Sequence, residues 1–385
     1  MRRVYLDHSA TTPLDPGVLE AMLPWMREGH GNASSPHASG RAARAAVEAA
    51  REQVAVALGV SPLDVLFTSG GTESDNQAVK GIAWAAREAG RGTHLVTSAI
   101  EHHAVLETCE WLTEHAGFTL TVVGCEPDGV VDPQRLLDAV RSDTVLVSVM
   151  AANNELGTVQ SLGEIGPALG SRGVPLHTDA VQAFGRTRLE PDDWEIGALS
   201  LSAHKFNGPK GVGVLMLRRD LPAHPVLHGG GQERGVRSGT LHTAGIVGCG
   251  AATELAASSL NEEAPRQRAL RDHLRDQLLA VGGVSLNGHP EARLTNNLNV
   301  AVTGCDGEAL LYALDARGVE ASTGSACQSG AAEPSHVLRA IGAPNDRAHL
   351  RLTLGRTTTP ADVEHAAAAF REAVKLLRDA GGGFV

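Results

Sequence analysis

The sequence predicts an α/β fold, a mostly parallel sheet covered by helices, followed by a smaller α+β domain. From about residue 40 to 250, Ala-rich helical stretches alternate with short runs rich in β-branched residues. Short apolar strands separated by helices are typical of a parallel sheet buried on both faces. The length of 385 residues exceeds the usual size of one domain, so we expect two domains.

The first domain is expected to contain seven strands. Its clearest helices lie at 41–58 and 76–90, where Ala and charged residues recur with helical spacing. The seven strand-like runs are 64–69, 93–98, 119–124, 144–150, 174–180, 198–204 and 211–217.

The second domain is expected to begin within a long helical segment, 253–283. We place the large domain at 13–255 and assign 1–12 and 256–385 to the small domain, although the N-terminal dozen residues can fold back onto either. The elements expected after the long helix are a strand at 296–302, a helix at 307–318 and a strand at 351–357, with a frayed end at 381–385.

Composition excludes several classes of function. The formal net charge is −11 and the basic residues are scattered, which argues against a nucleic-acid-binding face. We find no apolar run of about 18 residues and no secretory leader, so we expect no membrane association. The five cysteines form no CxxC pair, which argues against a disulfide framework or a closed zinc site and favours the cytoplasm.

Polar segments follow five of the expected strands. In open α/β sheets, ligands bind beyond the carboxyl ends of the strands, so these segments mark a candidate site. They are TSGGTESDN (68–76), SAIEHHAV (98–105), AANNELG (151–157), DAVQ (179–182) and SAHKFNGPKG (202–211).

One of these segments is a candidate phosphate site. Gly70, Gly71 and Thr72 precede a helix, where free backbone amides and the helix dipole favour an anion. An ordinary strand–helix turn with a threonine cap has the same pattern. This segment therefore indicates an anion site only together with the other polar segments.

Lysine is scarce, with four among 33 basic residues, and it is the basic side chain that forms imines. Lys210 reads as an exposed turn residue, whereas Lys205 lies between a strand and a turn. Asp179 ends a strand, where it either caps the next helix or holds a cationic ring nitrogen. A histidine after Glu101 can stack on a cofactor ring and move protons.

Three further segments carry candidate groups. The Gly-rich loop 228–240 suits a ligand or a subunit contact. Cys327 lies in a small, polar, Gly-rich segment, where an exposed thiol is more often chemical than structural. Arg351 is either a surface residue or a bidentate clamp for a substrate carboxylate.

Together these segments resemble the cysteine desulfurases of the NifS/IscS type, in the class V aminotransferase group. The resemblance runs nearly end to end, and the joint order of the motifs is far more specific than any one of them. Its remaining motifs are YLDHSATTP (5–13), HGGGQERGVRSGT (228–240), STGSACQSG (322–330), EPSHVLRA (333–340) and RLTLGRT (351–357).

The resemblance implies the fold type I of pyridoxal 5'-phosphate enzymes, a homodimer, and conversion of L-cysteine to L-alanine with transfer of sulfane sulfur to an enzyme cysteine. The sulfur would supply iron–sulfur cluster assembly or tRNA thiolation through an acceptor protein. Lys205, Cys327 and His102 would be catalytic, and Cys327 is also a candidate for a transient iron–sulfur ligand; we expect no other metal ligand.

The resemblance also assigns binding residues. His102 would stack on the ring, Asp179 would pair with the ring nitrogen, and Arg351, helped by Asn32, would bind the substrate carboxylate. The other residues implied at the cofactor are Gly71, Thr72, Asn154, Gln182, Ser202, His204, Lys205 and Thr240, the last reaching in from the other subunit.

Two departures from the family pattern are Ala203, where many members have glycine, and Gln328, where a small hydroxyl residue is usual. Three alternatives stay open at this stage. A class V aminotransferase or lyase would need Lys205 and Asp179 but not Cys327. A catalytically silent scaffold would bind no cofactor, and a selenocysteine lyase would share the whole site.

Overall fold

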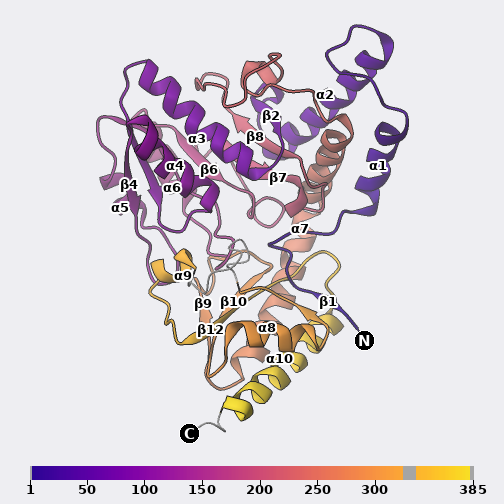
Figure 1. Ribbon diagram of the computed structural model, residues 1–385, viewed down its shortest axis with the longest axis vertical. Coiled ribbons are helices and arrows are strands. Elements are labelled where there is room, and N and C mark those ends of the chain that lie inside the picture. Colours follow the sequence, from indigo (N-terminus) through magenta and orange to yellow (C-terminus); the bar gives the residue numbers. More distant parts are fainter. Residues whose placement is uncertain (1, 324–334, 382–385) are drawn as a thin grey trace.

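The computed structural model describes residues 2–323 and 335–381. Figure 1 shows a larger upper lobe, in which strands lie between helices, and a smaller lower lobe built mainly from the C-terminal part of the chain. Helix α7 (Thr243–Leu279) runs from the upper lobe into the lower one. The fold is the α/β arrangement with a mostly parallel sheet that the sequence predicts.

The upper lobe contains a seven-stranded sheet with the order β2-β8-β7-β6-β5-β3-β4. All seven expected strands are confirmed. Five neighbouring strands, from β7 to β4, run parallel, and β8 runs antiparallel to both β2 and β7. The strands are β2 (Val65–Thr68), β3 (His94–Ser98), β4 (Thr119–Val123), β5 (Thr144–Ser148), β6 (Leu176–Asp179), β7 (Ile196–Ser202) and β8 (Gly213–Leu217).

Successive side chains of a strand point to opposite faces of the sheet, so the apolar strands present apolar side chains on both faces. Helices cover both faces. On β2, Val65 and Phe67 join one group of buried apolar residues, and Leu66 joins another. The helices of this lobe are α1 (Pro16–Arg27), α2 (Ala38–Leu58), α3 (Gly71–Glu88), α4 (His103–Ala116), α5 (Pro133–Asp138) and α6 (Leu162–Gly170).

The lower lobe has its own apolar core around a three-stranded antiparallel sheet of order β12-β10-β9. Outside the two larger sheets, β1 pairs in parallel with β11. The elements are β1 (Val4–Tyr5), β9 (Val284–Asn287), β10 (Asn297–Thr303), α8 (Gly307–Asp315), β11 (Val319–Glu320), β12 (Arg347–Thr353) and α10 (Pro360–Gly381). The short helix α9 (His336–Ala340) instead buries Val337 and Leu338 in the apolar core of the upper lobe.

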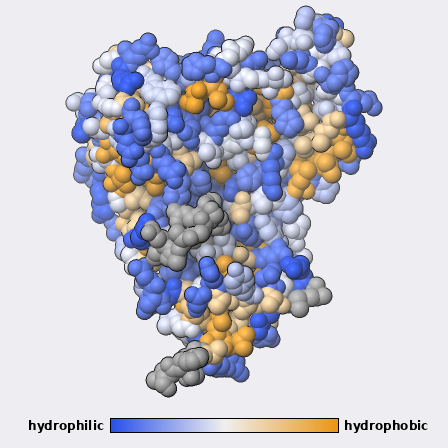
Figure 2. Space-filling model, in the orientation of Figure 1, coloured by the Kyte–Doolittle hydropathy of each residue, from blue (hydrophilic) through white to orange (hydrophobic). Residues whose placement is uncertain are grey.

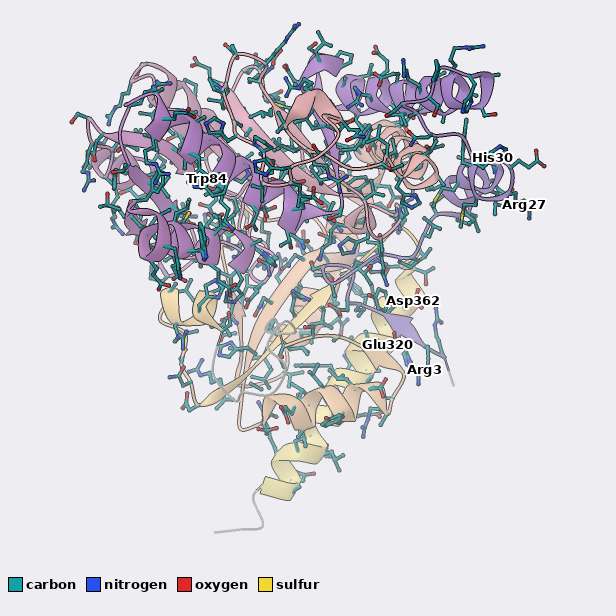
Figure 3. All side chains as sticks on the ribbon, turned by 45° about the horizontal axis from the view of Figure 1, so that its top comes forward. Arg3, Arg27, His30, Trp84, Glu320 and Asp362 are labelled. Atoms are coloured by element: carbon teal, nitrogen blue, oxygen red, sulfur yellow. The ribbon has the colours of Figure 1, made fainter. Side chains whose placement is uncertain are left out.

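The N-terminal segment connects the two lobes. Strand β1 is anchored in the lower lobe by ion pairs between Arg3 and Glu320 (2.7 Å) and between Arg2 and Asp362 (2.6 Å), whose neighbourhood is labelled in Figure 3. A few residues later, the amide of Thr12 donates to the carbonyl of His204 in the upper lobe. The domain boundaries at 13–255 and 256–385 stay a prediction.

The surface view in Figure 2 is mostly hydrophilic, with separate hydrophobic groups, one of them over α1. Leu19 and Met26 of that helix are 38% and 63% exposed. In the described part of the chain, no helix is both long and apolar enough to span a membrane.

Candidate active site

A cavity of about 270 Å³ lies at the carboxyl ends of the parallel strands, where an open α/β sheet binds its ligands. Its walls come from five polar segments of the upper lobe, from the N-terminal segment and from β12 of the lower lobe. The described residues that line it are Ser9, Ala10, Gly71, Thr72, Asp75, His102, Met150, Asn154, Asp179, Val181, Gln182, Ser202, His204, Lys205 and Arg351.

Lys205 lies on the cavity wall directly after β7, in the short 3-10 helix Ala203–Lys205. Its Nζ donates to the carbonyl oxygens of Ser9 (2.6 Å) and Ala10 (2.9 Å). The N-terminal segment therefore positions this amine. Sequence reasoning missed Ser9 and Ala10, because only the tertiary fold brings residues about 195 positions apart into contact.

Asp179 is the last residue of β6, and its side chain is buried at the cavity wall. One carboxylate oxygen accepts from the amide of Val181 at 2.9 Å. Burial raises the pKa of Asp179, while the nearby His102 and Lys205 favour its charged form. The carboxylate therefore faces the cavity with the amine of Lys205 and the imidazole of His102 as its electrostatic partners.

His102 is the N-cap of α4, where its Nδ1 accepts from the amide of Ala104 at 3.1 Å. That bond places the ring proton on Nε2 in the neutral form. Burial lowers the pKa of His102, opposed by Asp179, so the ring is neutral at neutral pH. A neutral, oriented imidazole on the cavity wall can stack on a planar ligand and exchange a proton.

The N-terminus of α3 faces the same cavity through Gly71 and Thr72. Gly70 precedes it without a side-chain cap, so the first amides of an 18-residue helix remain available to an anion. A Cβ on Gly213 of β8 would lie 2.6 Å from the Gly70 backbone, so Gly213 permits this close packing. Sequence reasoning did not single out Gly213.

Gln182, Ser202 and His204 complete this side of the cavity. The Nε2 of Gln182 donates to the carbonyl of Ser9 at 3.0 Å, whereas its buried Oε1 has no hydrogen-bond partner. Burial, followed by the charges of Lys205 and Lys210, lowers the pKa of His204 to about 4. The unpartnered Oε1 of Gln182 can accept a hydrogen bond from a ligand. The neutral His204 ring, whose Nδ1 is hydrogen-bonded to the hydroxyl of Thr11, lies on the same cavity wall.

Arg351 enters the cavity from β12, where its side chain is 4% exposed. It binds Asp7 Oδ1 at 2.8 Å and the carbonyl of Asn154 at 3.1 Å, while its Nε is buried without a partner. A buried guanidinium with an unused donor is suited to a carboxylate ligand.

Two predicted residues of the described chain, Asn32 and Thr240, do not line this cavity. Asn32 is exposed and accepts from the amide of Ser34 in its own loop. Thr240 is exposed at the end of the loop 228–240. Cys327 lies outside the described residues. Among the other lysines, Lys210 is exposed as expected and Lys375 is also exposed, whereas Lys80 is half-buried beside the ring of Trp111.

Comparison with known proteins identifies the class of this fold and site. The Aminotransferase class-V family matches residues 4–365. The cysteine desulfurase IscS of Methanosarcina thermophila is 48% identical over 380 residues, covering 98% of this chain and 93% of that protein. An IscS-like cysteine desulfurase of Mycobacterium tuberculosis is 48% identical over 383 residues, covering 98% and 97%.

Solved structures agree with these relatives. A NifS-like protein superposes with a TM-score of 0.91 at 38% identity, covering 97% of this chain and all of that chain. A structure of SspA in complex with cysteine has a TM-score of 0.81 at 37% identity, covering 91% and 98%. The chain therefore belongs to the class V aminotransferase family, whose members are pyridoxal-phosphate enzymes. Within that family it is a cysteine desulfurase of the NifS/IscS type.

Proposed function

We propose that this enzyme binds pyridoxal 5'-phosphate in the 270 Å³ cavity and uses it to transfer sulfur from L-cysteine to Cys327, releasing L-alanine. The observation that carries the proposal is that three groups suited to this cofactor face the same cavity. The amine of Lys205, the carboxylate of Asp179 and the uncapped N-terminus of α3 all face one cavity. An imine-forming amine, a partner for a cationic ring nitrogen and an anion site are the three needs of this cofactor.

The residues present fit the cofactor. The phosphate belongs at Gly71 and Thr72, with the Ser202 hydroxyl and the His204 ring beside it. The unpartnered Oε1 of Gln182 is a polar atom that a bound ring substituent would satisfy. His102 and Asn154 line the ring site. When bound, the cofactor draws electrons from the α-carbon of the amino-acid substrate.

The chain's own residues then account for the proton movements. Lys205 Nζ would take the α-proton of the substrate and return a proton to the product. Ionised Asp179 would favour a positive charge on the ring nitrogen of the bound cofactor. His102, neutral and protonated on Nε2, exchanges the proton of the substrate thiol.

Substrate orientation falls to Arg351, whose buried Nε is unused. A carboxylate bound there competes with Asp7 for the same guanidinium. We also retain Asn32 as a second contact to the substrate carboxylate, which requires the loop after α1 to approach the cavity.

Cys327 as a thiolate would attack the substrate sulfur, forming the S–S bond as the carbon–sulfur bond breaks. The described ends of its segment support this role. Ser322 pairs through its backbone with Arg351, a cavity residue, and Nε2 of His336 donates to the carbonyl oxygen of Glu101, next to His102. Because this thiol has to stay reduced, we place the reaction in the cytoplasm.

We further propose a homodimer in which Thr240 reaches the phosphate of the other subunit. Its exposed position at the end of the loop 228–240, away from its own cavity, is consistent with a role across an interface. The persulfide on Cys327 would pass to a scaffold for iron–sulfur clusters or to a tRNA-thiolation protein.

The proposal is tested by incubating the purified protein with L-cysteine and thiol reductant and measuring alanine and sulfide together. We expect equal amounts of both products and a visible absorption band from the lysine-bound cofactor. Lys205→Ala should lose the band and both products, whereas Lys210→Ala, five residues away in an exposed turn, should keep them. A colourless wild type that cannot be reconstituted would favour a silent scaffold instead.

A further inference from the structure

A second buried carboxyl group lies at the cavity, and the reaction proposed above does not use it. Asp75 is in the second turn of α3, is 1% exposed and lines the same cavity as Asp179. Its Oδ1 is buried with no hydrogen-bond partner and lies 3.6 Å from Nε2 of His177. An ionised carboxylate with such an oxygen would be very costly.

His177 gives Asp75 no counter-charge. Its Nδ1 and Nε2 are hydrogen-bonded to the hydroxyls of Ser148 (2.8 Å) and Ser200 (3.0 Å), and it is fully buried. Burial lowers the pKa of His177 to about 3, so the ring is neutral at any physiological pH. Within the described chain, no Lys or Arg forms an ion pair with Asp75.

The charged neighbours of Asp75 also oppose its ionisation. Asp179 on β6 and Glu101 after β3 are both carboxyl groups, and each raises the pKa of Asp75. Of the groups around it, only the hydroxyl of Ser200 favours the charged form. His102 and Lys205, by contrast, favour the charged form of Asp179.

We propose that Asp75 is a positioning residue that stays a neutral carboxylic acid, one end of an uncharged row with His177, Ser200 and Ser148. The neutral acid leaves Asp179 as the charged carboxylate facing the ring site, because two adjacent buried carboxylates do not both ionise. His177 lies two residues before Asp179 on β6, so both side chains point to the same face of the sheet. The consequence for the ring nitrogen rests on the proposed function; the protonation of Asp75 does not.

The protonation is tested by infrared difference spectroscopy of the holoenzyme at pH 7.5. Wild type minus Asp75→Asn should show the carbonyl stretch of a protonated carboxylic acid, which shifts in D₂O. The matched control is Asp64→Asn, a buried aspartate 3.4 Å from Arg218, which should show carboxylate bands only. Carboxylate bands from Asp75 would overturn the proposal. So would failure of Asp75→Asn to fold, because asparagine has the shape of the neutral acid.

The positioning role is tested by titrating the visible band of the lysine-bound cofactor against pH. Asp75→Asn should keep the midpoint within about 0.3 pH unit of wild type, whereas Asp75→Ala, which breaks the row, should move it and lower the band. A shift of about one unit or more in Asp75→Asn would mean that a charge had been removed and would contradict the proposal. If no band forms in the wild type, the proposed function fails while the infrared result stands.

Discussion

At the scale of single residues, the site depends on which buried groups carry charge. Asp179 has His102 and Lys205 as electrostatic partners, whereas no cation among the described residues favours the charged forms of Asp75 and Glu101. The local environment therefore favours different protonation states for three carboxyl groups of similar intrinsic acidity. One is suited to hold a cationic ring nitrogen, and two are suited to stay protonated.

Asp179→Asn is expected to lower kcat/KM for alanine formation by roughly 10²-fold or more, because it removes a preorganised charge at the ring site. Alanine release from L-cysteine measures the effect. Asp193→Asn, at an exposed aspartate after the same strand, serves as the control and should keep full activity. Wild-type turnover in Asp179→Asn would rule out its assigned role.

Glu101 predicts a pH dependence of stability. Its Oε1 accepts from Ser98 and Met150, its Oε2 is buried without a partner, and burial raises its pKa from 4.5 to about 8. Between those two values the unfolded chain releases a proton that the folded chain keeps. Stability therefore falls as pH rises through this window, by up to about 1.4 kcal/mol per pH unit, and the loss is complete above the folded value.

Glu101→Gln carries an amide where the neutral acid has its hydroxyl and should remove this dependence. The difference in unfolding free energy, variant minus wild type, should rise steadily from pH 5 to pH 8 in urea titrations. Two curves that stay parallel over this range would show that Glu101 is ionised in the folded enzyme.

At the scale of elements, the sequence predicts the seven strands and the polar segments that follow them. Lys205 and Asp179 could be found because each ends a short apolar run, and strand ends meet at one edge of a parallel sheet. Ser9, Ala10 and Gly213 could not be found, because their contacts arise only when distant segments pack. Asp75 was hidden because a charged residue early in a helix is normally a solvated one.

The loop 228–240 is held by a buried ion pair. Arg51 on α2 donates to both carboxylate oxygens of Glu233, at 2.7 and 2.9 Å, and Glu233 also accepts from the amide of Phe67. Glu233 and Arg234 have φ values of 45° and 59°, a strained region for residues other than glycine. The ion pair therefore holds the loop in a conformation that it would otherwise leave.

Arg51→Met should destabilise the protein by about 3–5 kcal/mol, because it leaves the carboxylate of Glu233 buried without its partner. It should also weaken cofactor binding, since the loop carries Thr240. Thermal unfolding and cofactor titration measure the two effects. Arg44→Met, at an exposed arginine on the same helix, should change neither; an unchanged melting temperature in Arg51→Met would contradict the role of the ion pair.

At the scale of the whole molecule, the cavity requires both lobes and the N-terminal segment. Arg351 comes from the lower lobe, Lys205 and Asp179 from the upper one, and Ser9 and Ala10 from the segment that connects them. Small changes in how the lobes pack would therefore alter the substrate contact while leaving the cofactor contacts in place. The proposed homodimer adds a requirement that a single chain does not meet.

Mixed dimers test that requirement. If Thr240 serves the other subunit, a dimer of Lys205→Ala with Thr240→Ala has one intact site, formed by Lys205 of one chain and Thr240 of the other. At limiting cofactor, the mixture should be clearly more active than either homodimer, up to half of wild type per dimer. Activity no higher than that of Thr240→Ala alone would assign Thr240 to its own subunit's site.

The most direct test of the central claim is the effect of Cys327→Ala on L-cysteine turnover. The account predicts that the variant keeps the visible band of the lysine-bound cofactor and loses release of alanine and sulfide. Cys305→Ala, a half-buried cysteine of the lower lobe, is the control and should keep both. Undiminished turnover by Cys327→Ala would contradict sulfur transfer to this cysteine and would favour a lyase that uses only Lys205 and Asp179.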